Sequence, residues 1–147
     1  MAELRSIEIR RLFRASPERV FEAFQNPALL REWSAPGEHR NERVEVDFRV
    51  GGRYRREMRF PDGSLQVLSG TYREIDPPRR LVYTYVWETL SVAETLVEIE
   101  LTPRGSETEL RLVHSGFDDA AFAANHERGW GDCFDQLARV CAEAKRP

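Results

Sequence analysis

The chain has 147 residues, of which 41% are hydrophobic and 32% are charged, and its formal net charge is −3 at pH 7. These values indicate one globular domain over residues 1–147, large enough to form a core without a metal ion or a disulfide. They argue against a nucleic-acid-binding protein, which usually carries a basic excess, and against a membrane protein, since no apolar run approaches about 20 residues.

The N-terminal part of the chain predicts one strand and two helices. The first residues do not have the layout of a signal peptide, so we expect a cytoplasmic location. Apolar and charged residues alternate from Ile7 to Phe13, which indicates a half-buried strand. Ser16 can cap a helix that begins at Pro17, and Asn26-Pro27 ends that helix and begins a second one, before a loop over residues 34–41.

Six more strands are predicted from the alternation of apolar and charged residues. They cover residues 44–50, 54–60, 65–75, 81–87, 95–101 and 108–114, and Gly- or Pro-containing turns separate most of them, as at Gly51-Gly52 and Pro61-Asp62-Gly63. One parity of each strand is apolar and the other is charged, which is typical of an antiparallel sheet with one covered and one solvated face.

The stretch between Arg40 and Arg59 holds seven of the 21 arginines, whereas the chain has a single lysine, Lys145. Most of these arginines share the charged parity with acidic residues such as Glu57, and cross-strand ion pairing explains them more simply than phosphate binding. Arg56 instead falls on the inward parity. An unpaired buried charge is costly, so Arg56 must pair, reach solvent or bind an anion, although a one-residue slip of the strand would reverse its face.

The last third of the chain is predicted to be helical. Asp118 can cap a short helix and Asn125 a longer one, along which apolar residues recur at helical spacing from Trp130 onward. Cys133 and Cys141 would lie about 12 Å apart along this helix, too far for a disulfide, so we expect two buried thiols. The order of strand, two helices, six strands and long helix predicts an α+β fold.

Several motifs, in a fixed order along the chain, resemble a known family. They are Ala15-Ser16-Pro17-Glu18-x-Val20-Phe21-x-Ala23-Phe24, Pro27-x-x-Leu30-x-x-Trp33, Gly51-Gly52-x-Tyr54, Pro61-Asp62-Gly63, Gly70-x-Tyr72-x-Glu74-Ile75-x-Pro77-Pro78-x-Arg80-Leu81-Val82 and Gly129-Trp130. Together they resemble the START-like (SRPBCC, Bet v 1-like) superfamily, in the branch homologous to the C-terminal domain of the activator of Hsp90 ATPase. The sequence departs from that branch at Ser34, where a second aromatic residue is common.

The resemblance implies a helix-grip fold, in which a curved seven-stranded antiparallel sheet wraps around a long C-terminal helix. Two short helices lie between strands 1 and 2, and there is usually a cavity between sheet and helix. Members of the superfamily bind lipids, sterols or polyketides, act as cyclases, or form one domain of a chaperone partner, so the fold alone does not decide the function.

The candidate ligand-cavity residues are the large or polar side chains predicted to face inward. They are Trp33, Tyr54, Arg56, Met58, Tyr85, Trp87, Thr95, Val97, His114, Phe117, Trp130 and Phe134. An apolar pocket with a few polar groups is the usual form of a small-molecule site, although the aromatic residues fit a plain core equally simply. Arg11 also has inward parity near a strand end, and His126 is expected to be exposed where the long helix begins.

The favoured hypothesis is a bacterial small-molecule-binding module that holds an apolar or aromatic ligand between sheet and helix. Arg56 or His114 would orient a polar or acidic group of that ligand. The alternative is a polyketide cyclase- or dehydratase-like enzyme with His114 as general acid or base, and the lesser alternative is a chaperone-interacting domain. Nothing in the sequence indicates turnover, so a binding protein is favoured over an enzyme.

Other partners are not expected. The histidines and cysteines lack the spacing of a zinc site, and no phosphate-binding loop or nucleophile elbow follows a strand, so neither a metal nor a cofactor is predicted. A nucleic-acid or membrane partner is not predicted either. A homodimer stays open, because the edge strands of a sheet need protection.

Overall fold

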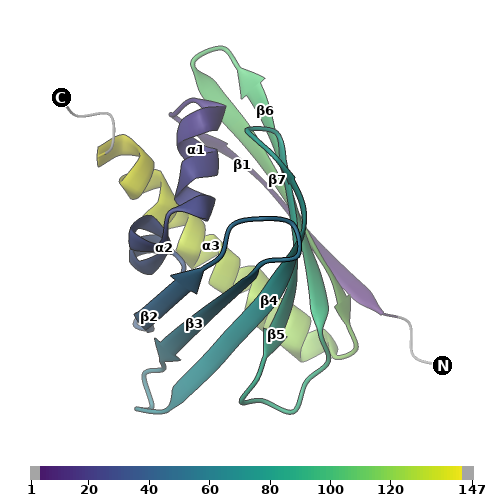
Figure 1. Cartoon of the computed structure of the whole chain (residues 1–147). Coiled ribbons are helices and arrows are strands. Elements are labelled where there is room, and N and C mark those ends of the chain that lie inside the picture. The colour runs from purple at the N-terminus through teal and green to yellow at the C-terminus, as the bar shows by residue number, and fades with distance from the viewer. Residues whose placement is uncertain (1–3, 144–147) are drawn as a thin grey trace.

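The computed structural model describes residues 4–143, and Lys145 lies outside them (Figure 1). The elements are β1 (Arg5–Phe13), α1 (Pro17–Gln25), α2 (Pro27–Trp33), β2 (Arg40–Val46), β3 (Arg53–Arg59), β4 (Leu65–Asp76), β5 (Arg80–Trp87), β6 (Thr95–Arg104), β7 (Glu107–Phe117) and α3 (Ala120–Glu143). This order and the α+β class are those predicted from the sequence.

The seven strands form one sheet in the order β1-β7-β6-β5-β4-β3-β2, and every neighbouring pair is antiparallel. The sheet curves around α3, which crosses its concave face, while α1 and α2 lie beside the C-terminal half of α3 (Figure 1). The predicted helix-grip architecture is therefore confirmed. No helix within residues 4–143 has the length and apolarity needed to cross a membrane.

The two short helices begin where the sequence predicts. The Ser16 hydroxyl accepts a hydrogen bond from the Arg19 amide at 3.2 Å, and Pro17 occupies the first turn of α1. Asn26 ends α1 and caps α2, because its side-chain oxygen accepts from the Ala28 amide at 2.9 Å.

The C-terminal helix differs from the prediction of two helices. It is one continuous helix whose first amides, those of Ala121 and Phe122, donate to the Asp119 carboxylate, so Asp119 rather than Asp118 is at its start. Asn125 lies inside the helix, where its side chain accepts from Arg128 instead of capping a new turn. No proline interrupts this segment, so a helix begun at Asp119 continues through it.

The second strand also differs from its predicted span of residues 44–50. β2 starts earlier, at Arg40, and its last pair joins Val46 to Tyr54. The chain then turns over residues 47–52, where Gly51 has a positive φ of 85°. A Cβ at Gly52 would lie 2.1 Å from the carbonyl oxygen of Asp47, so only glycine fits at this position of the turn.

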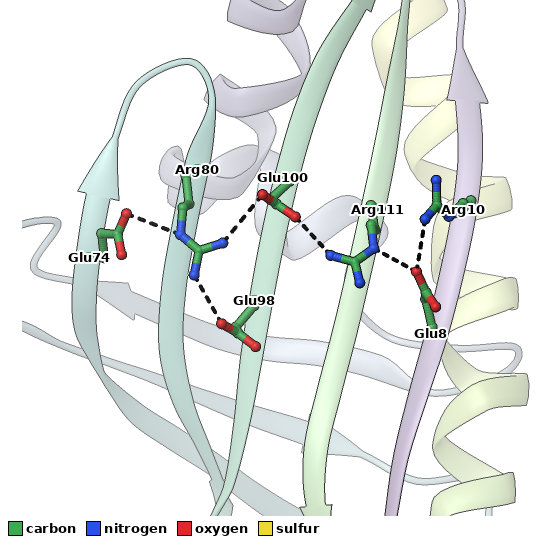
Figure 2. A network of polar contacts seen from close by, with 7 residues as sticks. All are labelled: Glu8, Arg10, Glu74, Arg80, Glu98, Glu100 and Arg111. Atoms are coloured by element: carbon green, nitrogen blue, oxygen red, sulfur yellow. Dashed lines mark hydrogen bonds and ion pairs between the residues drawn. The ribbon is translucent and has the colours of Figure 1, made fainter.

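The outward face of the sheet carries a network of ion pairs across β4, β5, β6, β7 and β1 (Figure 2). Arg80 lies 2.9 Å from Glu98, and Arg111 bridges Glu100 at 2.9 Å and Glu8 at 2.5 Å. In the arginine-rich stretch, Arg59 of β3 pairs with Glu42 of β2, which is the cross-strand pairing expected from the charged parity. Arg55 instead pairs with Glu57 along the same strand, and Arg49 pairs with Asp47 in the turn after β2.

Replacing Glu8 with glutamine is expected to reduce the acid sensitivity of the fold. Hydrogen bonding from Arg111, together with its charge, holds the pKa of the Glu8 carboxyl below the ordinary 4.5. The stability from this lowered pKa is present above pH 4.5 and is lost as the pH falls through the folded-state pKa. Urea unfolding between pH 3 and pH 7 should give a flatter pH profile for Glu8→Gln than for wild type. Glu32→Gln is the control, because Glu32 is exposed and forms no ion pair with the residues that the structure describes, and identical slopes in all three proteins would contradict the prediction.

Candidate functional site

A cavity of about 500 Å³ lies between the first half of α3 and the concave face of β3 and β5. Its wall is mostly aromatic or apolar, with Met58, Phe60, Tyr85, Trp87, Phe122 and Trp130 among its members. The loop after α2 and Leu90, between β5 and β6, complete it. Exposed charged residues, including Glu38, Arg128 and Asp132, line the part nearest solvent, which we call the rim.

Five of the twelve candidate residues line this cavity, namely Arg56, Met58, Tyr85, Trp87 and Trp130. Trp33 and Tyr54, with Arg56 and Trp130, surround a second void of only about 20 Å³. This void is large enough for about one water molecule.

The other five candidates lie in the packed core and line neither space. They are Thr95, Val97, His114, Phe117 and Phe134, all buried. Strand parity correctly assigned the strand residues among them to the concave face, but α3 packs against the β1 and β7 side of that face and leaves the β3–β5 side open. Trp33 is also a core residue, 1% exposed, whose indole nitrogen donates to the Ala23 carbonyl oxygen at 2.8 Å.

His126 lines the cavity, although the sequence analysis expected it to be exposed. Its Nδ1 donates to the Phe122 carbonyl at 2.9 Å, and its Nε2 accepts from the indole of Trp87 at 3.1 Å. Burial lowers the pKa of His126, in agreement with a neutral ring that holds Trp87 in place. His126 stands four residues before Trp130, and this spacing places the two side chains on one face of a helix. The spacing is the sequence signal from which the cavity position of His126 could be predicted.

Arg56 is the buried cation of the site, with 7% of its surface exposed. Its Nη1 donates to the backbone carbonyl of Ser34 at 3.2 Å, and its guanidinium carbon lies 5.9 Å from the centroid of the Tyr54 ring. Its Nε is buried and has no hydrogen-bond partner among the described residues. Arg11, the other arginine with inward parity, is not in the cavity, because it pairs at 2.5 Å with Asp135 on α3.

Tyr85 supplies a neutral hydroxyl beside this cation. Burial raises the pKa of its phenol well above the usual range, so the hydroxyl keeps its proton and can donate a hydrogen bond. Within residues 4–143 that hydroxyl has no hydrogen-bond partner. The cavity thus combines an aromatic wall with one buried cation and one unused hydroxyl donor.

His114 is fully buried, and both of its ring nitrogens are engaged. The Trp130 indole donates to Nδ1 at 3.0 Å, so the ring proton is on Nε2, which donates to the Thr95 hydroxyl at 2.7 Å. That hydroxyl in turn donates to the Tyr85 carbonyl oxygen at 3.0 Å. Burial also lowers the pKa of His114, so it is a neutral structural residue behind Trp130, and the structure does not place it where a general base must be.

No group of three His, Cys, Asp or Glu side chains in the described part of the chain is arranged to hold a metal ion. The two cysteines are buried on α3 as predicted, and Cys133 lines the cavity.

The chain is similar in sequence and fold to a known family and to several proteins of known structure. The family model described as Activator of Hsp90 ATPase homolog 1-like protein matches residues 14–142. Protein CV1439 from Chromobacterium violaceum is 31% identical, with a TM-score of 0.84, over 92% of this chain and 96% of that one. Mll3558 from Rhizobium loti is 29% identical, with a TM-score of 0.81, over 95% and 99%. CalU16 from Micromonospora echinospora is 26% identical, with a TM-score of 0.73, over 94% and 76%. The search of curated proteins finds no significant match.

Proposed function

This chain belongs to the activator of Hsp90 ATPase homolog 1-like family, and we propose that it binds a small apolar or aromatic molecule between the sheet and α3. The observation that carries the proposal is the cavity of about 500 Å³ with its largely apolar wall, to which Phe60, Tyr85, Trp87, Phe122 and Trp130 contribute aromatic rings. Sites for small molecules have typical volumes of roughly 300–1,000 Å³ and combine an apolar lining with a few placed polar groups.

The aromatic wall is held in position by contacts within the protein. The Trp87 indole donates to His126, and the Trp130 indole donates to His114. The Tyr85 ring lies between them, with centroids 6.1 Å from Trp87 and 6.2 Å from Trp130. Rings fixed in this way lose little conformational entropy when a ligand arrives, which favours binding.

The structure does not favour the enzyme alternative, which required His114 to act as general acid or base at the ligand. A general base must reach the proton it removes, directly or through one water, whereas His114 lies outside the cavity lining with both nitrogens engaged. The proposal is therefore a binding function.

A pair of glycine substitutions on α3 tests the cavity as the binding site. Gly129 lines the cavity, and a Cβ there would lie 3.7 Å from Pro36, which also lines it. Gly131, two residues on, is not a lining residue, and a Cβ there would meet nothing within 4 Å. Leucine at either position should stabilise the helix by about 0.5–1 kcal/mol, because glycine is a poor helix former.

The neutral fluorophore N-phenyl-1-naphthylamine is the probe for this pair. Wild type and Gly131→Leu are expected to bind it and raise its fluorescence, whereas Gly129→Leu should weaken binding at least tenfold because its side chain occupies the cavity. Fluorescence titration measures the three dissociation constants. Equal binding by the two variants, or no binding by wild type, would contradict the proposed function.

A further inference from the structure

We propose that the ligand is an apolar monocarboxylic acid whose carboxylate pairs with Arg56. This inference rests on the proposed function and specifies the chemical class of the molecule bound. It is carried by the state of Arg56, a buried cation at the cavity wall without a protein counter-charge.

Arg56 is unlike the other charged residues of the protein. Throughout residues 4–143 it is the one arginine that is buried, and no carboxylate of that region lies within ion-pair distance of it. Its strand neighbour Arg55 has two carboxylates within 4 Å, those of Glu57 and Glu88. Exposed arginines without a partner are solvated by water, but removing a guanidinium from water is costly unless an opposite charge compensates.

The side chains around Arg56 cannot supply that charge. Tyr72, Tyr83 and Tyr85 each experience its positive charge, yet burial raises the pKa of all three phenols well above the usual range. Burial likewise raises the pKa of the Cys133 thiol to about 12. These groups are therefore neutral at physiological pH, so none of them balances the charge of Arg56, and a bound anion in the cavity can supply the counter-charge.

Arg56 keeps N–H donors that the described residues do not use. Nη1 is anchored by the Ser34 carbonyl, while Nη2 makes no hydrogen bond within the described residues. Guanidinium groups bind carboxylates through paired N–H donors in one plane, and such charge-assisted bonds are among the strongest in proteins. The unused Tyr85 hydroxyl on the same wall is an additional donor. Water can occupy the small void behind Arg56, but water carries no charge.

The rim argues for a single carboxylate on the ligand. Glu38 and Asp132 are exposed there, and Arg128 is hydrogen-bonded to Asn125. The two carboxylates outnumber the one arginine of the rim, so a second carboxylate at the mouth would meet a net negative charge, whereas an apolar body can lie against Trp87, Phe60 and their neighbours. The structure thus favours a molecule with one buried anionic end.

The test compares 2-naphthoate with its neutral isostere 2-naphthamide by isothermal titration calorimetry at pH 7.5. Wild type is expected to bind the acid about 10- to 100-fold more tightly, the ratio for a hydrogen-bonded charge worth roughly 1.5–3 kcal/mol. Arg56→Met should abolish that preference. Arg53→Met is the matched control, because Arg53 lies on the opposite, exposed face of the same strand and forms no ion pair with any residue from 4 to 143. It should keep the preference of wild type.

The outcomes separate this inference from the proposed function. Equal affinity of wild type for acid and amide, or a preference that survives in Arg56→Met, would overturn the carboxylate assignment while leaving the cavity a binding site. Failure of wild type to bind the acid, the amide and N-phenyl-1-naphthylamine would overturn the proposed function itself. Arg56→Lys is the second variant, used in case Arg56→Met does not fold. Lysine keeps the positive charge but lacks the planar guanidinium, so we expect the preference for the acid over the amide to be reduced several-fold but not lost.

Discussion

Replacing Gly70 with alanine is expected to destabilise the protein by on the order of 3 kcal/mol or more, a large part of the 5–15 kcal/mol typical of a domain. Gly70 lies in β4 opposite Tyr54 of β3. A Cβ at this position would be 1.9 Å from the carbonyl oxygen of Thr84 and 2.7 Å from the Tyr54 ring. The first of these is backbone, so relief requires β4 and β5 to separate.

The same substitution should disturb the site. The Tyr54 hydroxyl donates to the Thr84 carbonyl at 2.7 Å, directly across Gly70, and that hydrogen bond holds the ring beside Arg56. Urea unfolding measures the loss of stability. Gly131→Ala is the control, since its Cβ meets nothing within 4 Å and should gain up to about 1 kcal/mol. A Gly70→Ala protein as stable as wild type would show that the two strands can move apart without cost.

Strand parity was sufficient to predict that three polar candidate side chains face inward. Arg56, Thr95 and His114 are all polar, yet all three are buried on the concave face, because successive side chains of a strand point to opposite faces. The alternation along a strand fixes the face of each position, whatever side chain stands there. It therefore predicts that Arg56 is buried among the many arginines of that stretch.

The position of the cavity could not be predicted in the same way. It depends on α3 crossing one part of the concave face and leaving another open, which is a property of tertiary packing and not of any strand. Consequently the sequence groups Phe117 and Phe134 with Trp87, although all three are buried and only Trp87 lines the cavity. The loop after α2, which contributes His39 to the lining, has no periodic pattern from which its path could be inferred.

Local signals near the helix ends were also ambiguous. Asp118, Asp119 and Asn125 are all good N-cap residues, and the sequence offers no means of choosing among them. The choice of Asp119 produces one helix, and this continuous helix brings His126 and Trp130 to the same wall of the cavity. A cap at Asn125 would have left His126 in the first turn of a new helix.

Replacing His114 with alanine is expected to destabilise the protein by about 3–5 kcal/mol. The substitution empties a fully buried position and leaves the Trp130 indole without its acceptor, and both effects are costly. His39→Ala is the control. His39 is half-buried at the cavity, where its Nδ1 donates to the Pro36 carbonyl at 2.7 Å, and its loss should cost less than about 1.5 kcal/mol.

The pH dependence of stability tests whether His114 is held neutral in the folded protein. Burial lowers the pKa of folded His114 below 6.5, whereas the unfolded chain takes up that proton near pH 6.5. The contribution of His114 to stability is therefore present above pH 6.5 and falls as the pH drops below it. His114→Ala should lose this part of the pH dependence and keep that of His126, whose pKa is also lowered. Urea unfolding between pH 5 and pH 8 measures both effects, and a variant with the stability and the pH slope of wild type would refute the structural role assigned to His114.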